Sequence, residues 1–320
     1  MKIFYSRLLI LFLFILIIIF PTCTFQGATS GLLLWYSILL PTLLPFMILT
    51  SIILKTQAYT ILNKPFLPII QYIFHTSRNG SFAVIIGFLC GYPMGAKIIN
   101  NLYEEEYISL SEAQYLLSFC NNSSPMFIIS FFVYKIIEDI QLLPAVFLSV
   151  YGSAFLMSII SRKLYLKQKN DDIKDSDIVK SKTIISFKML DDIIIENIIL
   201  IMKIGGYIMI FSILISIATH INNTLSSTFS CYNPIYILCS IPLLEITNGL
   251  QMYKEMLYGD AYYSFMVFLV SMGGFCSIGQ TQCVITAPEI KISHYFTQKI
   301  LTAILAVSIW NIFFIFFDFY

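Results

Sequence analysis

The chain has 320 residues, of which 58% are hydrophobic and 12% charged, and its formal net charge is +1. Soluble domains carry about 25% charged residues, so lipid is expected to surround most of this protein, and the near-neutral charge excludes a nucleic-acid-binding protein. Its seven cysteines show no CxxC pair, no metal-ligand spacing and no disulfide framework of the secreted kind. We therefore expect buried thiols, no metal and no cofactor.

Residues 3–20 form the first apolar segment, behind Lys2 and Arg7. This pattern fits a retained membrane helix or a cleaved signal peptide. We favour the retained helix because nothing downstream resembles an exported domain. Residues 1–30 are thus interpreted as an N-terminal transmembrane helix and linker.

The first half, residues 31–161, contains further apolar segments of about membrane-spanning length. Pro41 and Pro45 remove two backbone donors near the middle of one of them, which predicts a kinked or opened helix. A shorter stretch, 57–74, fits a short span, a re-entrant piece or an interfacial helix. The longer segments are 31–54, 81–101, 113–137 and 140–161.

Helix-breaking and polar residues interrupt the segment 81–101. Proline and glycine free backbone groups that lipid cannot satisfy, so such a break needs a protein or aqueous environment. Lys97 follows the break and either extends to the headgroups or forms the cationic wall of an anion site. The candidate binding residues here are Gly91, Tyr92, Gly95 and Lys97.

A second polar stretch lies inside the segment 113–137. Ser109 and Glu112 form a capping box that predicts a new helix, and this helix meets a run of small polar residues before Pro125. A helix that resumes at Pro125 would present free N–H groups to an anion or polar ligand; a plain external turn is the alternative. The candidate residues are Cys120, Asn121, Asn122, Ser123 and Ser124.

Residues 162–195 are interpreted as a charged loop followed by an amphipathic helix on the membrane surface. Residues 162–188 carry eight of the 19 Lys and Arg residues, which places this stretch in the cytoplasm by the positive-inside rule. It separates the chain into two halves.

The second half, residues 196–320, repeats the polar pattern within the apolar segments 196–219, 233–250, 261–285 and 299–319. Gly249 precedes Gly274 by the same interval as Gly95 precedes Cys120. Broken helices in corresponding places of two halves indicate a transporter binding site. The candidate residues are Glu245, Thr247, Asn248, Gly249, Gly273, Gly274, Ser277 and Gln280.

These features predict an all-α, polytopic integral membrane protein with about eight to ten membrane segments and two broken-helix pairs that meet near the middle of the bilayer. Whether the two repeats are parallel or inverted stays open. The sequence contains no HExxH, GxSxG or Walker motif, so we expect no enzyme activity and a gradient-driven process.

The chain resembles the Gate, or nucleoside-recognition, membrane family, and within it the sporulation members. The resemblance covers residues 30–315 and rests on the motifs at 40–46, 91–97, 118–125, 245–249 and 273–280. It implies two gate-type repeats and a role in endospore formation. It further implies export of dipicolinate, an aromatic dicarboxylate, from the mother cell across the outer forespore membrane.

Three functions therefore stay open: a transporter of a small organic anion, a structural or assembly protein needed for the spore cortex, and a nucleoside transporter. A homo-oligomer and a complex with other sporulation membrane proteins also stay open. For Glu245 we favour proton uptake with the substrate, since burial and a nearby anion favour the protonated form. The alternatives are a pair with Lys97 or a cap on the next helix.

Overall fold

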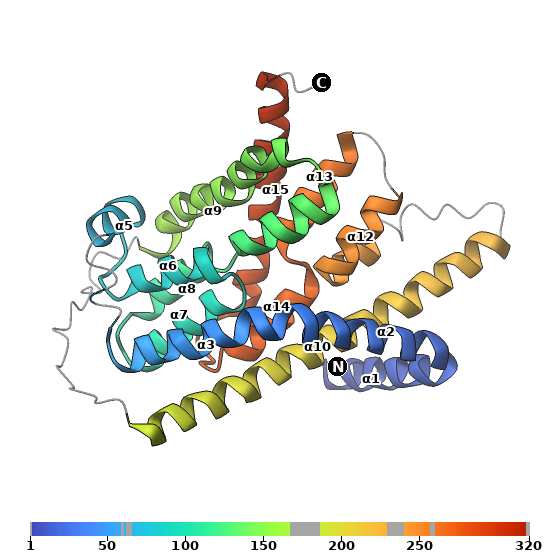
Figure 1. Ribbon diagram of the computed structural model, residues 1–320, viewed down its shortest axis with the longest axis horizontal. Helices are drawn as coiled ribbons and strands as arrows, with labels where there is room; N and C mark the ends of the chain where they lie inside the picture. The colour runs from blue at the N-terminus through green and yellow to red at the C-terminus, as the bar shows by residue number, and fades with distance from the viewer. Residues whose placement is uncertain are drawn as a thin grey trace.

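The computed structural model describes residues 2–58, 61, 66–166, 186–228, 240–256 and 260–317. All regular structure in these residues is helical, which confirms the all-α fold (Figure 1). Five stretches are long and apolar enough to cross a membrane: Pro21–Lys55, Ile140–Tyr165, Phe187–Thr228, Tyr262–Val284 and Ile292–Ile315. Shorter apolar helices cover Ile10–Ile19, Gly80–Cys90 and Phe127–Ile137. The chain is a polytopic integral membrane protein.

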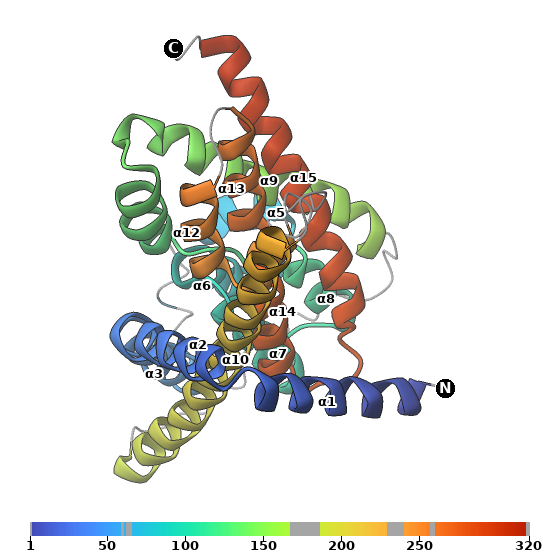
Figure 2. The ribbon, with the colours of Figure 1, turned by 90° about the vertical axis from the view of Figure 1, so that its right-hand side faces the viewer.

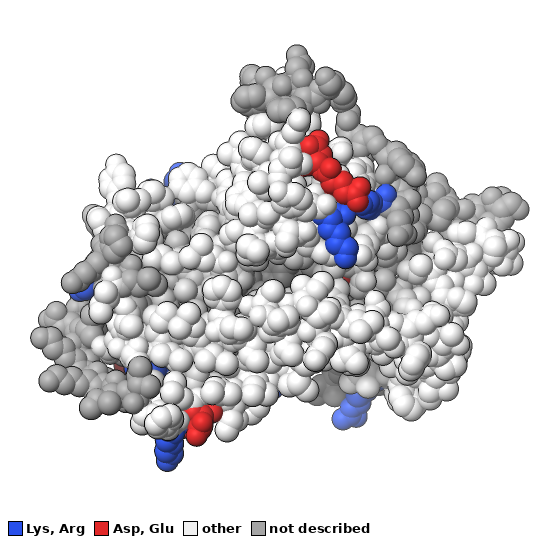
Figure 3. All heavy atoms as spheres, viewed as in Figure 1, with Lys and Arg blue, Asp and Glu red and all other residues white. Residues whose placement is uncertain are grey.

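The outer surface is mainly apolar, as lipid contact requires. In the face drawn in Figure 3, a few Lys, Arg, Asp and Glu side chains lie near the edges of a broad uncharged area. Large apolar side chains are exposed along most of the long helices, for example Leu33, Leu148 and Ile199.

A nearly continuous helical rod follows α1 (Lys2–Ile19) and consists of α2 (Pro21–Leu34), η1 (Trp35–Leu39) and α3 (Leu40–Lys55). The expected disruption near Pro41 is a π-helical turn, η1, in which the Leu40 N–H donates to the Trp35 carbonyl. This wider turn gives room for the proline ring while the rod continues. The proposed boundary after residue 30 lies inside α2.

The first proline- and glycine-rich element turns back on itself. After the short α5 (Leu67–Phe74), α6 (Gly80–Cys90) and α7 (Met94–Glu104) form a helical hairpin with its tip at Gly91–Pro93. A Cβ on Gly87 or Gly95 would lie 1.9 or 2.0 Å from the Cys120 carbonyl oxygen. Both helices therefore approach the Cys120 carbonyl so closely that a residue larger than glycine would not fit at position 87 or 95.

The next element is an interrupted helix that does not turn back. It comprises α8 (Leu110–Leu117), a non-helical stretch at 118–124, and the π-helix η2 (Phe127–Ile137). After η3 (Ile140–Leu142), α9 (Leu143–Tyr165) packs along both α8 and η2. The Tyr151 hydroxyl donates to the Ser123 carbonyl at 2.9 Å, which joins α9 to the interruption.

The second half contains α10 (Phe187–Thr228), η4 (Ile241–Leu244), α12 (Ile246–Met256), α13 (Asp260–Met272), α14 (Gly274–Val284) and α15 (Ile292–Phe317). Here α12 returns over η4, since a Cβ on Gly249 would lie 2.2 Å from the Pro242 carbonyl oxygen. The α13–α14 helix is interrupted at Gly273, whose φ of 86° favours glycine. α15 runs antiparallel beside it (Figure 2), with Tyr263 near Trp310 and Phe275 near Phe296.

The described parts of the two halves follow the same order: a long helix, a hairpin (α6–α7 in the first half and the shorter η4–α12 in the second), an interrupted helix and a closing helix. The corresponding long helices run antiparallel, because Gly27 lies against Ile213 while Lys55 pairs with Glu196. The closing helices α9 and α15 are also antiparallel, because Gly152 lies near Ile309 and Tyr165 accepts a hydrogen bond from Gln298. The repeats are therefore inverted, which settles the point that the sequence left open.

The helix α10 differs from its expected form. Its 42 residues correspond to about 63 Å at 1.5 Å per residue, roughly twice the apolar thickness of a bilayer. The stretch expected as an amphipathic surface helix leading into the next span is the first part of α10, so the proposed boundary at residue 195 falls inside this helix. Most of the charged loop, 167–185, lies outside the described residues.

Candidate functional site

The tip of the first hairpin lies against the first helix interruption. The Tyr92 N–H donates to the Asn122 carbonyl at 2.8 Å, and a Cβ on Gly91 would lie 2.7 Å from the Ser124 nitrogen. An interruption within an apolar membrane segment leaves backbone groups that need partners. The hairpin tip supplies one of them.

The first interruption also contacts the second half. The Asn121 side-chain nitrogen donates to Thr281 Oγ1 at 2.9 Å and to the Tyr295 hydroxyl at 2.8 Å. The Ser123 hydroxyl donates to the Val270 carbonyl at 2.8 Å. Residues of one repeat thus satisfy polar groups of the other.

The second hairpin and the second interruption are placed in the corresponding way. A Cβ on Gly274 would lie 3.1 Å from the Leu243 carbonyl oxygen and 3.3 Å from the Ile246 nitrogen. A Cβ on Gly273 would lie 3.3 Å from the Tyr92 ring. Tyr92, at the tip of the first hairpin, therefore contacts the interruption of the second repeat.

Lys299 is the buried cation of this region, and our sequence interpretation missed it. Its side chain, 1% exposed, donates to the Asn121 carbonyl at 3.1 Å and to Asn122 Oδ1 at 3.3 Å. The central polar site, defined here as Tyr92, Asn121, Asn122, Thr281, Tyr295 and Lys299, thus joins both repeats. Lys299 stands at the edge of an apolar segment in the sequence, where a lysine normally extends to the headgroups.

Glu245 is 3% exposed and caps the start of α12. One carboxylate oxygen accepts from the Thr247 N–H at 2.9 Å, and the other accepts from the backbone and side chain of Asn248 at 2.9 and 3.0 Å. Asn248 also donates to Ser212 on α10 at 3.2 Å. These hydrogen bonds are the ones expected if Glu245 caps the next helix, which is one of the alternatives to proton uptake.

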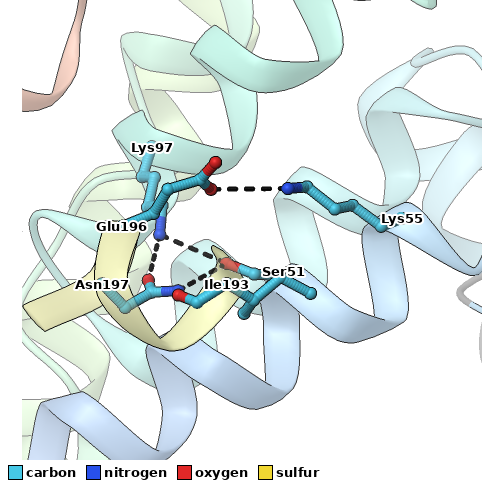
Figure 4. A network of polar contacts seen from close by, with 6 residues as sticks. All are labelled: Ser51, Lys55, Lys97, Ile193, Glu196 and Asn197. Carbon is cyan, nitrogen blue, oxygen red and sulfur yellow. Dashed lines mark hydrogen bonds and ion pairs between the residues drawn. The ribbon is translucent and has the colours of Figure 1, made fainter. Parts of the chain in front are cut away.

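Lys97 lies apart from the central polar site. Its side chain points toward α3 and α10 (Figure 4), where it donates to Ser51 Oγ at 3.2 Å and to Asn197 Oδ1. The alternative of a pair between Lys97 and Glu245 is not realised, because each side chain has its own set of partners. We call Ser51, Lys97 and Asn197 the peripheral lysine cluster; the pair Lys55–Glu196, at 3.5 Å, lies beside it.

A comparison of the amino-acid sequence with curated proteins finds a named relative. The chain is similar to the sporulation integral membrane protein YlbJ of Bacillus subtilis. The two are 25% identical over 323 residues, which cover 92% of this chain and 79% of YlbJ. No family model matches the chain, and no solved structure matches it.

The relationship to YlbJ supports the resemblance that the motifs indicate, because it extends over nearly the whole chain. The matched stretch includes most of both halves of this chain. Its printed name describes a membrane protein of sporulation, and it names no substrate.

The remaining candidate residues have local contacts. Ser277 donates to the Gly274 carbonyl at 2.9 Å, and Gln280 donates to the Cys276 sulfur at 3.3 Å. Cys120 contributes its carbonyl oxygen to the close approach of Gly95. Among the described residues, no group of three His, Cys, Asp or Glu side chains is placed to hold a metal ion.

Proposed function

We propose that the chain is a gradient-driven transporter of a small organic anion during endospore formation. The observation that supports this function best is the meeting of two inverted hairpin-and-interrupted-helix units at Tyr92. Inverted repeats with interrupted helices at their interface are a common architecture of secondary transporters. Movement of one unit against the other would give the central polar site access to either side of the membrane.

Two helix starts favour an anionic substrate. The N-termini of α7 and α14 have no side-chain cap, and they lie at the first hairpin tip and at the second interruption. Free N–H groups and the helix dipole make such ends attractive to carboxylates. By contrast, α12 already has the Glu245 carboxylate at its start.

Dipicolinate is the substrate that we propose, and the outer forespore membrane, facing the mother cell, is the proposed location. This proposal rests on the similarity to a sporulation membrane protein and on the resemblance to the sporulation members of the Gate family. A planar dicarboxylate offers one carboxylate to each of two helix N-termini. A nucleoside carries no charge and would gain less from them.

A structural role in assembly of the spore cortex is the alternative. It is favoured by the hydrogen bonds with which the interruptions satisfy each other, such as Asn121 with Thr281. Asn121→Ala separates the two functions. A transporter should lose flux in this variant while the protein accumulates normally, whereas a structural protein should keep its sporulation phenotype whenever it accumulates.

The direct test is ligand-dependent thermal stabilisation of the purified protein by dipicolinate, uridine and short dicarboxylates. A ligand at 100 times its Kd stabilises the native state by about 2.7 kcal/mol, so binding raises the Tm measurably. We expect dipicolinate to stabilise most and uridine not at all, together with dipicolinate flux into proteoliposomes. Stabilisation by uridine would support a nucleoside transporter, and no stabilisation or flux with any of them would refute transport of these substrates.

A further inference from the structure

The ammonium group of Lys299 lies among oxygen atoms that resemble a cation site. Its two hydrogen-bond partners are a backbone carbonyl, that of Asn121, and an amide oxygen, that of Asn122, both within the first interruption. In the part of the chain that the structure describes, no carboxylate forms an ion pair with Lys299. The charge is held by neutral dipoles alone.

Asn121, one of the two residues that contact Lys299, carries a further acceptor oxygen. The side-chain oxygen Oδ1 of Asn121 is buried, and none of the described residues donates a hydrogen bond to it. A buried acceptor without a donor costs about 1–3 kcal/mol in general, so natural proteins retain few of them. The interruption therefore keeps one acceptor oxygen in addition to the two that Lys299 contacts.

Interrupted membrane helices commonly use the carbonyl groups of their unwound backbone to coordinate a small cation. We propose that the interruption at 118–124 is such a cation site and that Lys299 fills it with a built-in ammonium group. The closing helix α15 supplies the cation from the other repeat. The wild-type protein accordingly needs no free monovalent cation at this point, and loss of the ammonium group would create a site for one.

The inference is independent of the transported substrate, because it concerns how the interruption is held together. It also distinguishes the two buried lysines. Lys97 contacts only side-chain oxygens of regular helices, on Ser51 and Asn197. Lys299 contacts the backbone of an interruption. Only the second arrangement should accept a free cation in place of the ammonium group.

The experiment measures the Tm of the full-length purified protein in choline, sodium, potassium and methylammonium chloride at equal ionic strength. Wild type should have the same Tm in all four salts. Lys299→Ala should unfold on the order of 5–10 °C lower in choline and recover at least half of this loss in methylammonium or sodium. Lys299→Met, whose chain fills the space without a charge, should show the loss without recovery.

Lys97→Ala is the matched control, because it also removes a buried ammonium group. It should lose stability equally in all four salts. Recovery of Lys299→Ala that is no greater than that of Lys97→Ala, or a wild-type Tm that depends on the cation to the same extent, would overturn the proposal.

If Lys299→Ala does not accumulate, Asn122 tests the same site with the lysine in place. Asn122→Ala and Asn122→Asp both lose the side-chain N–H that donates to the Phe119 carbonyl, but only Asn122→Ala also loses the oxygen that faces the ammonium group. Asn122→Asp should therefore have the higher Tm of the two, because its charged oxygen still accepts from Lys299. Equal loss in both variants would show that this oxygen does not stabilise Lys299 and would contradict the cation site.

Discussion

At the residue scale, the hydrogen bonds of Glu245 bear on two hypotheses for its role, helix capping and proton uptake with the substrate. Each of its oxygens accepts a hydrogen bond from a backbone N–H at the start of α12. In Glu245→Gln the amide nitrogen would face one of these N–H groups, donor against donor. We expect a loss of about 0.5–2 kcal/mol, the usual value of a helix cap, and a larger loss in Glu245→Ala.

The same variant tests proton coupling. A capping role predicts that flux through Glu245→Gln keeps the wild-type dependence on the pH gradient, measured in proteoliposomes at matched protein content. Flux that no longer responds to the gradient, with substrate binding retained, would instead assign the coupling proton to Glu245. Thr247→Ser is a suitable control, because it keeps both the backbone N–H that Glu245 caps and the side-chain hydroxyl.

Lys97 requires a stability experiment before a transport experiment. Its ammonium group is stabilised by Asn197 and Ser51, so Asn197→Leu leaves a buried charge with one remaining partner. We expect this variant to lose at least about 3 kcal/mol, while the double variant Lys97→Met with Asn197→Leu regains much of the loss, since an apolar pair can replace a buried polar one.

The readout is the Tm of each variant, with Lys135→Met as the control for loss of an exposed lysine. If Lys97→Met keeps its Tm but no longer responds to dipicolinate, the peripheral lysine cluster belongs to the anion site after all. An additive loss in the double variant would show that Lys97 and Asn197 do not act together.

At the element scale, the glycine and proline positions predicted where helices break, but they did not predict how. Pro93 and Gly273 both interrupt apolar stretches of similar composition, yet the chain turns back at the first and continues beside α15 at the second. Whether the chain turns back or continues depends on tertiary contacts, such as the approach of Gly87 and Gly95 to one carbonyl oxygen. Lys299 was missed for a related reason: only folding brings α15 to the interruption at Asn121.

The close packing of the first hairpin can be tested by replacing each of two glycines with alanine. A Cβ on Gly95 would lie 2.0 Å from the Cys120 carbonyl oxygen, whereas a Cβ on Gly206 meets nothing within 4 Å. Gly95→Ala should therefore separate the hairpin from the interruption and cost at least about 1–3 kcal/mol. Gly206→Ala should be neutral or slightly stabilising, because alanine is the better helix former by about 1 kcal/mol. Similar Tm values for the two variants would contradict the close approach.

At the scale of the whole molecule, the sequence predicted two corresponding halves but not their relative direction. Hydropathy and glycine spacing are the same for a parallel and an inverted pair, so they carry no information on it. Antiparallel contacts between corresponding helices, such as Gly152 with Ile309 together with Tyr165 with Gln298, supply that information. The inverted arrangement places equivalent loops on opposite sides of the membrane.

The inverted arrangement predicts that two exposed loop residues lie on opposite sides of the membrane. Asp139 lies between the first interrupted helix and α9, and Glu289 lies at the equivalent place before α15. The α9 end at Tyr165 accepts a hydrogen bond from Gln298 near the start of α15, so Glu289 lies on the same side as residues 162–166, where the basic segment begins. By the positive-inside rule this side is cytoplasmic.

We therefore expect a membrane-impermeant maleimide to label Asp139→Cys in intact cells and to label Glu289→Cys only after the membrane is opened. The unmodified protein gives the background that must be subtracted, because Cys283 is half-buried, unlike the four buried cysteines of the described residues, and Cys231 and Cys239 lie outside those residues. Labelling of both variants from one side would mean that the repeats are parallel in the membrane. Labelling of Glu289→Cys alone in intact cells would preserve the inversion but reverse the orientation, because the two loops would then have exchanged sides.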